Sequence, residues 1–168
     1  LTAGEFDVRF SPQDFLVADW TPAGVRAAID SLLGKEDVDL VITLGVLASN
    51  DMARRDSLPK PVIAPLVIDP VLQNLPQQNG RSGVHNLNYV ALPSNLASNL
   101  KRFRDIVPFS RVTILVPQYL FDIIPDMAQR MVQPIPGFDA EKDVLAVGHS
   151  VDVVLTELSA NTEAVYIA

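Results

Sequence analysis

Three residues of the sequence carry the side chains of a hydrolase. Ser49 would be the nucleophile, His85 the base and Asp69 the acid that orients it. No G-x-S-x-G nucleophile elbow surrounds Ser49, so the spacing does not support this assembly. Neither His85 nor His149 has a second His, Cys or Glu at metal-ligand spacing. We therefore predict a protein that is not an enzyme and that holds no metal or cofactor.

Binding of a small anion is a second kind of chemistry that the sequence could support. Gly80–Gly83 is not followed by Lys-Ser/Thr and matches neither a Walker A loop nor G-x-G-x-x-G, which disfavours a nucleotide. The Leu44–Ser49 turn, however, can offer backbone N–H groups at a helix N-terminus to a carboxylate. The alternative is a plain strand-to-helix turn that needs Gly45 for close packing, and the sequence leaves both open.

Two further candidates follow predicted strands. Asp69 precedes Pro70 at a strand end, where its carboxylate can accept hydrogen bonds from a ligand amine or hydroxyl. The alternative is an Asp that binds its own backbone to begin a turn, as Asp before Pro often does. Tyr119 follows Val116-Pro117-Gln118 at the carboxyl end of a predicted strand, where it could contact a flat or apolar ligand.

Alternating strands and helices are expected to position these residues. Apolar runs predict buried strands, and residues at helical spacing predict the helices between them. This alternation is typical of an α/β protein with parallel strands, whose carboxyl ends line a ligand crevice. The expected strands are Phe6–Phe10, Val38–Leu44, Val62–Ile68, Val84–Tyr89, Arg111–Val116, Val144–Val147 and Ala164–Ile167, and the expected helices are Pro22–Gly34, Leu47–Arg55, Ser94–Val107, one lined by Leu120 to Met131, and one beginning at Ser150.

The chain divides into two α/β halves. The connection from Asp69 to Gly83 is rich in Pro, Gln, Asn and Gly and separates the strands of the first half from those of the second. We predict a first lobe over residues 1–90 and a second lobe over 91–168. Leu1 and the strand-like Ala164–Ala168 suggest a fragment, with the first lobe incomplete at its start and the second at its end.

Composition limits the class of partner. The 168 residues carry a net charge of −7, which argues against nucleic acid, because phosphate binding relies on clustered Lys and Arg. The one dense basic run, Lys101–Arg104, fits the solvated end of a helix. There is no cysteine, hence no disulfide or thiolate site, and no apolar stretch long enough to span a membrane.

The order of several short phrases resembles the ABC-transporter substrate-binding proteins of the tryptophan/tyrosine type. The phrases are Asp39–Gly45 leading into a helix start of small residues, Pro61–Ile63 running to Asp69-Pro70, Gly83-Val84, and Arg111–Val116. The resemblance covers Gly24 to Val116, and the remainder agrees only in pattern. It implies the type 1 periplasmic-binding-protein fold, with two lobes that are each a parallel three-layer α/β sandwich of Rossmann-like βαβ units.

The resemblance also implies ligand-binding positions, carried over one by one. They are Gly45, Val46 and Ser49, then Asp69, and Tyr119 from the second lobe. The chain departs from the family at Val46-Leu47, where the family has Thr-Pro, and at Arg81-Ser82 before the Gly-Val pair. The ligand therefore need not be an aromatic amino acid.

The function implied by the resemblance is that of a binding component of an ABC-type uptake system. Such a protein lies in the periplasm or otherwise outside the cytoplasm, holds an amino-acid-like or related metabolite in an interlobe cleft without turnover, and presents its closed form to a transporter permease. The alternative is an effector-sensing domain of a transcriptional regulator or signalling receptor with the same fold. A small α/β hydrolase is a third hypothesis, which lacks its motifs.

Overall fold

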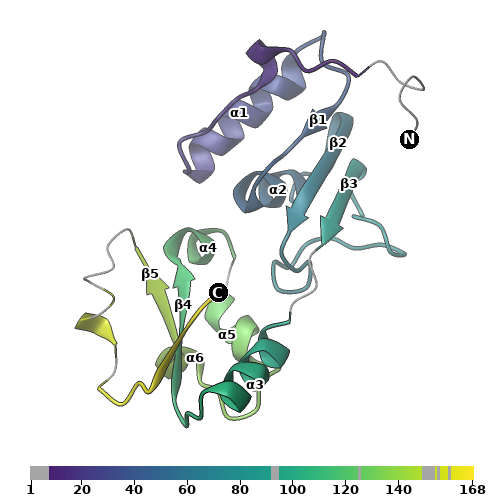
Figure 1. Ribbon diagram of the computed structural model, residues 1–168. Helices are drawn as coiled ribbons and strands as arrows, with labels where there is room; N and C mark the ends of the chain where they lie inside the picture. The colour runs from purple at the N-terminus through teal and green to yellow at the C-terminus, as the bar shows by residue number, and fades with distance from the viewer. Residues whose placement is uncertain (1–7, 92–94, 125, 149–153, 155, 159) are drawn as a thin grey trace. The chain divides into compact units, whose positions relative to one another are not determined.

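The computed structural model describes residues 8–91, 95–124, 126–148, 154, 156–158 and 160–168. Within them, no helix combines the length and the apolar character needed to cross a membrane. The elements in chain order, labelled in Figure 1, are η1 (Pro12–Asp14), α1 (Pro22–Gly34), β1 (Val41–Ile42), α2 (Val46–Ala53), β2 (Ser57–Val67), β3 (His85–Ala91), α3 (Leu96–Ile106), β4 (Val112–Pro117), α4 (Gln118–Ile123), α5 (Met127–Val132), α6 (Ala140–Asp143), β5 (Val144–Val147) and β6 (Ala164–Ile167).

The chain forms two compact units. Unit 1 comprises residues 1–66 and 77–90, and unit 2 comprises residues 67–76 and 91–168. Each unit holds one three-stranded sheet, in the order β1-β2-β3 in unit 1 and β5-β4-β6 in unit 2. The protein is therefore of the α/β class with parallel strand pairing, as the alternation of strands and helices predicted.

Helix α1 begins where the sequence predicted it. Thr21 caps the helix because its hydroxyl accepts a hydrogen bond from Gly24 N–H at 3.0 Å, and Pro22 occupies the first helical position. The carboxylate of Asp19 in turn accepts hydrogen bonds from the backbone and hydroxyl of Thr21. The buried face consists of Val25, Ile29 and Leu33, which repeat at helical spacing.

An ion-pair network joins α1 to α2. Arg55, just beyond α2, contacts Asp30 of α1 at 2.7 Å and Asp51 of α2 at 2.8 Å. Partial burial lowers the pKa of Arg55, but the hydrogen bonds and charges of these two carboxylates outweigh it, so the pKa is raised overall. Arg26 of α1 also reaches Asp51, at 3.1 Å. The two helices are therefore held together by charge as well as by apolar packing.

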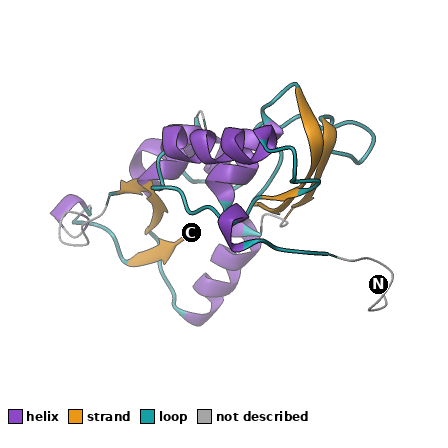
Figure 2. Ribbon diagram, turned by 90° about the horizontal axis from the view of Figure 1, so that it is seen from above, coloured by secondary structure: helices purple, strands orange, loops and turns teal. Residues whose placement is uncertain are grey.

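The sheet of unit 1 confirms the predicted parallel pairing of its first two strands. Val41 lies opposite Val62, and Ile42 lies opposite Ile63. Strand β3 lies beside β2 (Figures 1 and 2). The side chain of Asn86 in β3 donates from Nδ2 to the Leu58 carbonyl of β2 at 2.9 Å. All three strands therefore belong to one sheet.

The predicted strand Val38–Leu44 was too long, since β1 spans only Val41–Ile42. The physical reason is a side chain that takes the place of a neighbouring strand. The Lys60 ammonium donates to the carbonyl of Val38 at 2.7 Å and also to that of Lys35. The chain before Val41 is thus tied to a lysine rather than to a ladder of backbone hydrogen bonds.

The apolar runs of unit 1 predicted strands covered on both faces, and this was wrong for the described residues. Val41, Val62 and Ala64 are buried, whereas Ile42 and Ile63 are 39% and 37% exposed. Residues that alternate along a strand point to opposite faces. The described elements of unit 1 therefore cover one face of its sheet.

The sheet of unit 2 follows the prediction more closely. Strand β4 is central and pairs in parallel with β5 on one side and with β6 on the other, so that Ile114 lies between Val144 and Tyr166. Consecutive residues Val112, Thr113 and Ile114 are all buried. Both faces of β4 are therefore covered, as expected of a central parallel strand.

Two predicted elements differ from the structure in unit 2 and at the N-terminus. The single helix expected from Leu120 to Met131 is divided into α4 and α5, because Asp126 has a φ of 55° and the sequence has Pro125 beside it. The strand expected at Phe6–Phe10 is not formed by residues 8–10, and its first two residues lie outside the described range. The predicted start of the Ser150 helix lies outside it as well.

Glu163, just before β6, is hydrogen-bonded to the backbone just before β4. Its carboxylate accepts hydrogen bonds from Ser110 N–H at 2.6 Å and from Arg111 N–H at 3.3 Å. These backbone donors hold the pKa of Glu163 below its ordinary value of 4.5. A carboxylate with a lowered folded-state pKa contributes stability above its unfolded value and loses it as the pH falls through the folded value.

We expect Glu163→Gln to lower the free energy of unfolding at neutral pH, because the amide cannot replace a charged acceptor. The loss should begin to shrink as the pH falls below 4.5 and should vanish once the pH has fallen through the lowered pKa of the folded protein, where wild-type Glu163 itself becomes protonated. Urea unfolding at several pH values measures this. Glu157→Gln, at another exposed glutamate, is the control. An equal loss for Glu163→Gln at all pH values would contradict the assignment.

Candidate functional site

The turn from β1 to α2 has a backbone conformation reserved for glycine. Gly45 is the N-cap of α2, with φ 112° and ψ 155°. Other residues enter this region only at a cost of about 1–3 kcal/mol, so it is essentially restricted to glycine. A Cβ built on Gly45 would meet no atom within 4 Å. The glycine therefore serves backbone conformation and not close packing, and the space beside it is open.

Among the described residues, the first N–H groups of α2 have no partner within the helix. Ser49 N–H is bonded to the Gly45 carbonyl at 3.0 Å, and the N–H groups of Val46, Leu47 and Ala48 precede that first helical bond. Within the described part of the chain, no side chain caps them at Gly45. The partial positive charge of a helix N-terminus adds to these donors. The turn can therefore accept a carboxylate or a similar anion.

Two buried hydroxyl-bearing residues lie within four residues of Gly45 in the sequence. Ser49 is fully buried, and its hydroxyl makes a long contact of 3.5 Å with the Thr43 carbonyl. Thr43 is 5% exposed, and its Oγ1 is buried without a hydrogen-bond partner among the residues that the structure describes. A buried polar atom without a partner costs about 1–3 kcal/mol. The end of β1 thus carries a polar group that stability alone does not explain.

Gly45 and Thr43 together single out this edge of the sheet. Gly45 has a backbone conformation that other residues avoid, and Thr43 has an unsatisfied buried hydroxyl. The two residues are two positions apart in the sequence. Local departures from favourable geometry concentrate at functional sites. We define the Gly45 turn as residues 43–49, and it is the candidate site. It brings together the predicted residues Gly45, Val46 and Ser49.

Asp69 belongs to unit 2 and makes the local turn that the sequence offered as its alternative role. Its Oδ1 accepts hydrogen bonds from Val71 N–H at 2.8 Å and Leu72 N–H at 3.0 Å. Gln73, which the sequence analysis did not single out, is fully buried, and its Oε1 accepts from Ile68 N–H and Asp69 N–H. The described contacts of Asp69 therefore organise the chain after β2.

Tyr119 also belongs to unit 2, where it is the second residue of α4. Its ring is partly buried. The preceding Gln118 donates to Asp122 along the same helix at 3.1 Å. Tyr119 follows the carboxyl end of β4, as predicted.

The hydrolase assembly gains no geometric support. His85 is exposed at the first position of β3, whereas the Ser49 hydroxyl is buried and directed at a backbone carbonyl. In the described segments, no group of three His, Cys, Asp or Glu residues could hold a metal ion. The Gly45 turn therefore offers hydrogen-bond donors without an accessible nucleophile among its hydroxyl groups.

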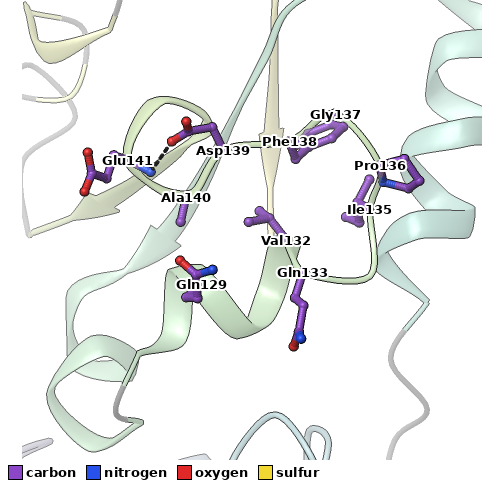
Figure 3. Close-up of a pocket in the computed structure, with 10 residues that line it drawn as sticks. All are labelled: Gln129, Val132, Gln133, Ile135, Pro136, Gly137, Phe138, Asp139, Ala140 and Glu141. Carbon is purple, nitrogen blue, oxygen red and sulfur yellow. Dashed lines mark hydrogen bonds between the residues drawn. The ribbon is translucent and has the colours of Figure 1, made fainter.

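Unit 2 contains a surface hollow that the sequence analysis did not predict. It measures about 580 Å³ and is lined by the segment from Gln129 to Glu141 (Figure 3). Val132 and Ile135 are buried in its wall. The Asp139 carboxylate is occupied by a hydrogen bond from Glu141 N–H at 3.0 Å. The closely spaced Pro134, Pro136 and Gly137 are the signal for this loop in the sequence.

No protein-family model, curated protein or solved structure matches this chain.

Proposed function

We propose that this chain binds an amino-acid-like metabolite through the Gly45 turn and releases it unchanged, as the binding component of an ABC-type uptake system outside the cytoplasm. In this proposal the two units are the α/β lobes of a type 1 periplasmic binding protein. The observation that carries the proposal is the uncapped N-terminus of α2 beside a glycine whose open flank leaves room for a ligand. The resemblance of the Asp39–Gly45 phrase to that family supports it.

The ligand group that this turn suits is a carboxylate. Its oxygens can accept from the N–H groups of Val46, Leu47 and Ala48, which point out of the helix end. Hydrogen bonds to an ionised acceptor contribute about 1.5–3 kcal/mol, more than bonds between neutral groups. Every amino acid carries such a carboxylate. The rest of the ligand would then set the specificity.

Thr43 supplies the second argument for binding. Its buried hydroxyl has no partner among the described residues, and in this proposal a molecule bound at the turn supplies one. A buried hydroxyl that is paired only when the ligand is bound lowers the stability of the free protein and raises the affinity for the ligand. A substitution that removes the hydroxyl should therefore raise stability and lower ligand affinity if the hydroxyl serves binding, whereas it should lower stability if the hydroxyl serves the fold.

The experiment measures binding and stability on Thr43→Val. Isothermal titration calorimetry with the common amino acids identifies a ligand of the wild type, and the matching amines without a carboxylate should not bind. Thr43→Val keeps the side-chain shape and is expected to raise the free energy of unfolding by about 1 kcal/mol, because a buried unsatisfied hydroxyl is removed. The same variant should weaken ligand binding roughly tenfold, the loss of one hydrogen bond.

Thr113→Val is the matched control. Thr113 is 6% exposed in β4, but its hydroxyl is already paired with that of Thr162 at 2.8 Å. Its replacement should lower the stability and leave ligand affinity unchanged. Equal binding of the carboxylate-free amines, or conversion of a bound amino acid to product, would overturn the proposed function.

A further inference from the structure

An exposed asparagine–glycine pair forms the tip of a tight turn in unit 1. Asn79 and Gly80 have φ values of 50° and 75°, and both residues are exposed. Gln78 and Arg81 close the turn with two backbone hydrogen bonds, of 3.1 Å and 2.9 Å. Two successive left-handed residues are the signature of a type I′ turn, for which Asn-Gly is the preferred sequence.

The same pair combines a reactive sequence with an accessible backbone nitrogen. The two hydrogen bonds that close the turn use the N–H groups of Gln78 and Arg81 and leave the Gly80 nitrogen outside that pairing. Glycine has no Cβ, so nothing shields its nitrogen from the side-chain amide of the preceding residue. A Cβ at Gly80 would lie in open space, which confirms that this turn is uncrowded.

We propose that Asn79 is a site of spontaneous deamidation in this protein. The Gly80 nitrogen attacks the Asn79 side-chain carbonyl carbon and gives up its proton, the amide group leaves as ammonia, and a cyclic imide forms. Water then opens the imide at either carbonyl, and the Gly80 nitrogen regains a proton. The products are aspartate or isoaspartate, and the sum of the steps is hydrolysis of one amide by one water.

The other left-handed asparagines of the described chain show why Asn79 stands apart. Asn74 has a φ of 53° and is exposed, but Leu75 follows it and is buried. Asn86 has a φ of 64°, but its side chain is held by the Leu58 carbonyl and its successor is Leu87. Of these three, Asn79 alone is followed by glycine.

The turn itself limits the rate. Ring closure requires the backbone to leave the left-handed conformation, so the two closing hydrogen bonds must open first. Such opening at an exposed turn is frequent compared with unfolding of a core strand. We therefore expect Asn79 to react more slowly in the folded protein than in the denatured chain, and faster than any other asparagine of the folded protein.

The consequences are local and specific. Aspartate adds a negative charge two residues from Arg81, which closes the turn. Isoaspartate adds a methylene group to the main chain, which is incompatible with the short pairing between Gln78 and Arg81. The change would therefore loosen the chain that leads through Ser82 into β3, where the Ser82 hydroxyl donates to the Leu87 carbonyl at 2.7 Å.

The experiment follows the folded protein in mildly alkaline buffer by peptide mapping and mass spectrometry. The deamidated form, in which a carboxyl group replaces the amide, should accumulate several-fold faster at Asn79 than at Asn74. Asn74 serves as the internal control. In the urea-denatured chain, where the turn no longer limits the rate, Gly80→Ala should slow the reaction at Asn79 several-fold, since the added methyl group crowds the attacking nitrogen. The urea-denatured chain gives the unrestrained rate. Equal conversion of Asn74 and Asn79, or no effect of Gly80→Ala, would overturn the proposal.

Discussion

Replacing Gln73 with methionine is expected to lower the free energy of unfolding by about 2–4 kcal/mol. Gln73 is fully buried, and its Oε1 accepts hydrogen bonds from Ile68 N–H at 2.9 Å and from Asp69 N–H at 3.3 Å. Methionine has a similar size but offers no oxygen, so both backbone donors would lose their acceptor. Each unsatisfied buried donor costs about 1–3 kcal/mol.

Urea unfolding measures the total effect, and hydrogen exchange of the Ile68 and Asp69 amide protons measures the local one. Both amides should lose protection in Gln73→Met. Gln77→Met is the matched control, because Gln77 is exposed in the same connection and its replacement should change stability by less than about 0.5 kcal/mol. If both variants unfolded at the same urea concentration, the role assigned to Gln73 would be wrong.

Gln73 also shows where sequence reasoning about a site fails. It lies in a polar connection rich in turn-forming residues, where glutamine is normally exposed. Its burial depends on the strand end at Ile68 and on the turn made by Asp69, which together place two N–H groups around one side-chain oxygen. Such a tertiary arrangement leaves no periodic signal. In the sequence, the apolar Leu75 two residues after Gln73 is a local indication that part of this connection is buried.

Strands were predictable to different degrees in the two units. In unit 2, the predicted strands Val144–Val147 and Ala164–Ile167 match β5 and β6. In unit 1, β1 is shorter than predicted, because Lys60 takes the Val38 carbonyl. An apolar run indicates which residues can form a strand. The length of the strand depends also on whether a neighbouring strand supplies backbone hydrogen bonds.

The Gly45 turn was found from sequence, but its physical character was not. A glycine between a strand and a helix is compatible with close packing or with an unusual φ. The φ of 112° and the open space beside the missing Cβ decide for the second. The unsatisfied Thr43 hydroxyl could not be predicted, since burial and hydrogen bonding depend on tertiary packing.

Ile114→Ala tests the central position of β4 and should lower the free energy of unfolding by about 3–4 kcal/mol. Ile114 is fully buried on the central strand, between Val144 of β5 and Tyr166 of β6, so truncation would leave a cavity in close-packed surroundings on one face of the sheet. Val165→Ala is the control, because Val165 is 38% exposed on β6, and its truncation should cost less than about 1 kcal/mol.

The comparison of the two variants discriminates between topologies. A central parallel strand with both faces covered requires the large difference between Ile114→Ala and Val165→Ala. If β4 were instead an edge strand, Ile114 would have one neighbouring strand and the cavity could close. Urea unfolding, together with hydrogen exchange of the β4 amides, reports the outcome. Similar losses for both variants would contradict the β5-β4-β6 order and, with it, the placement of Tyr119 at the carboxyl end of a central strand.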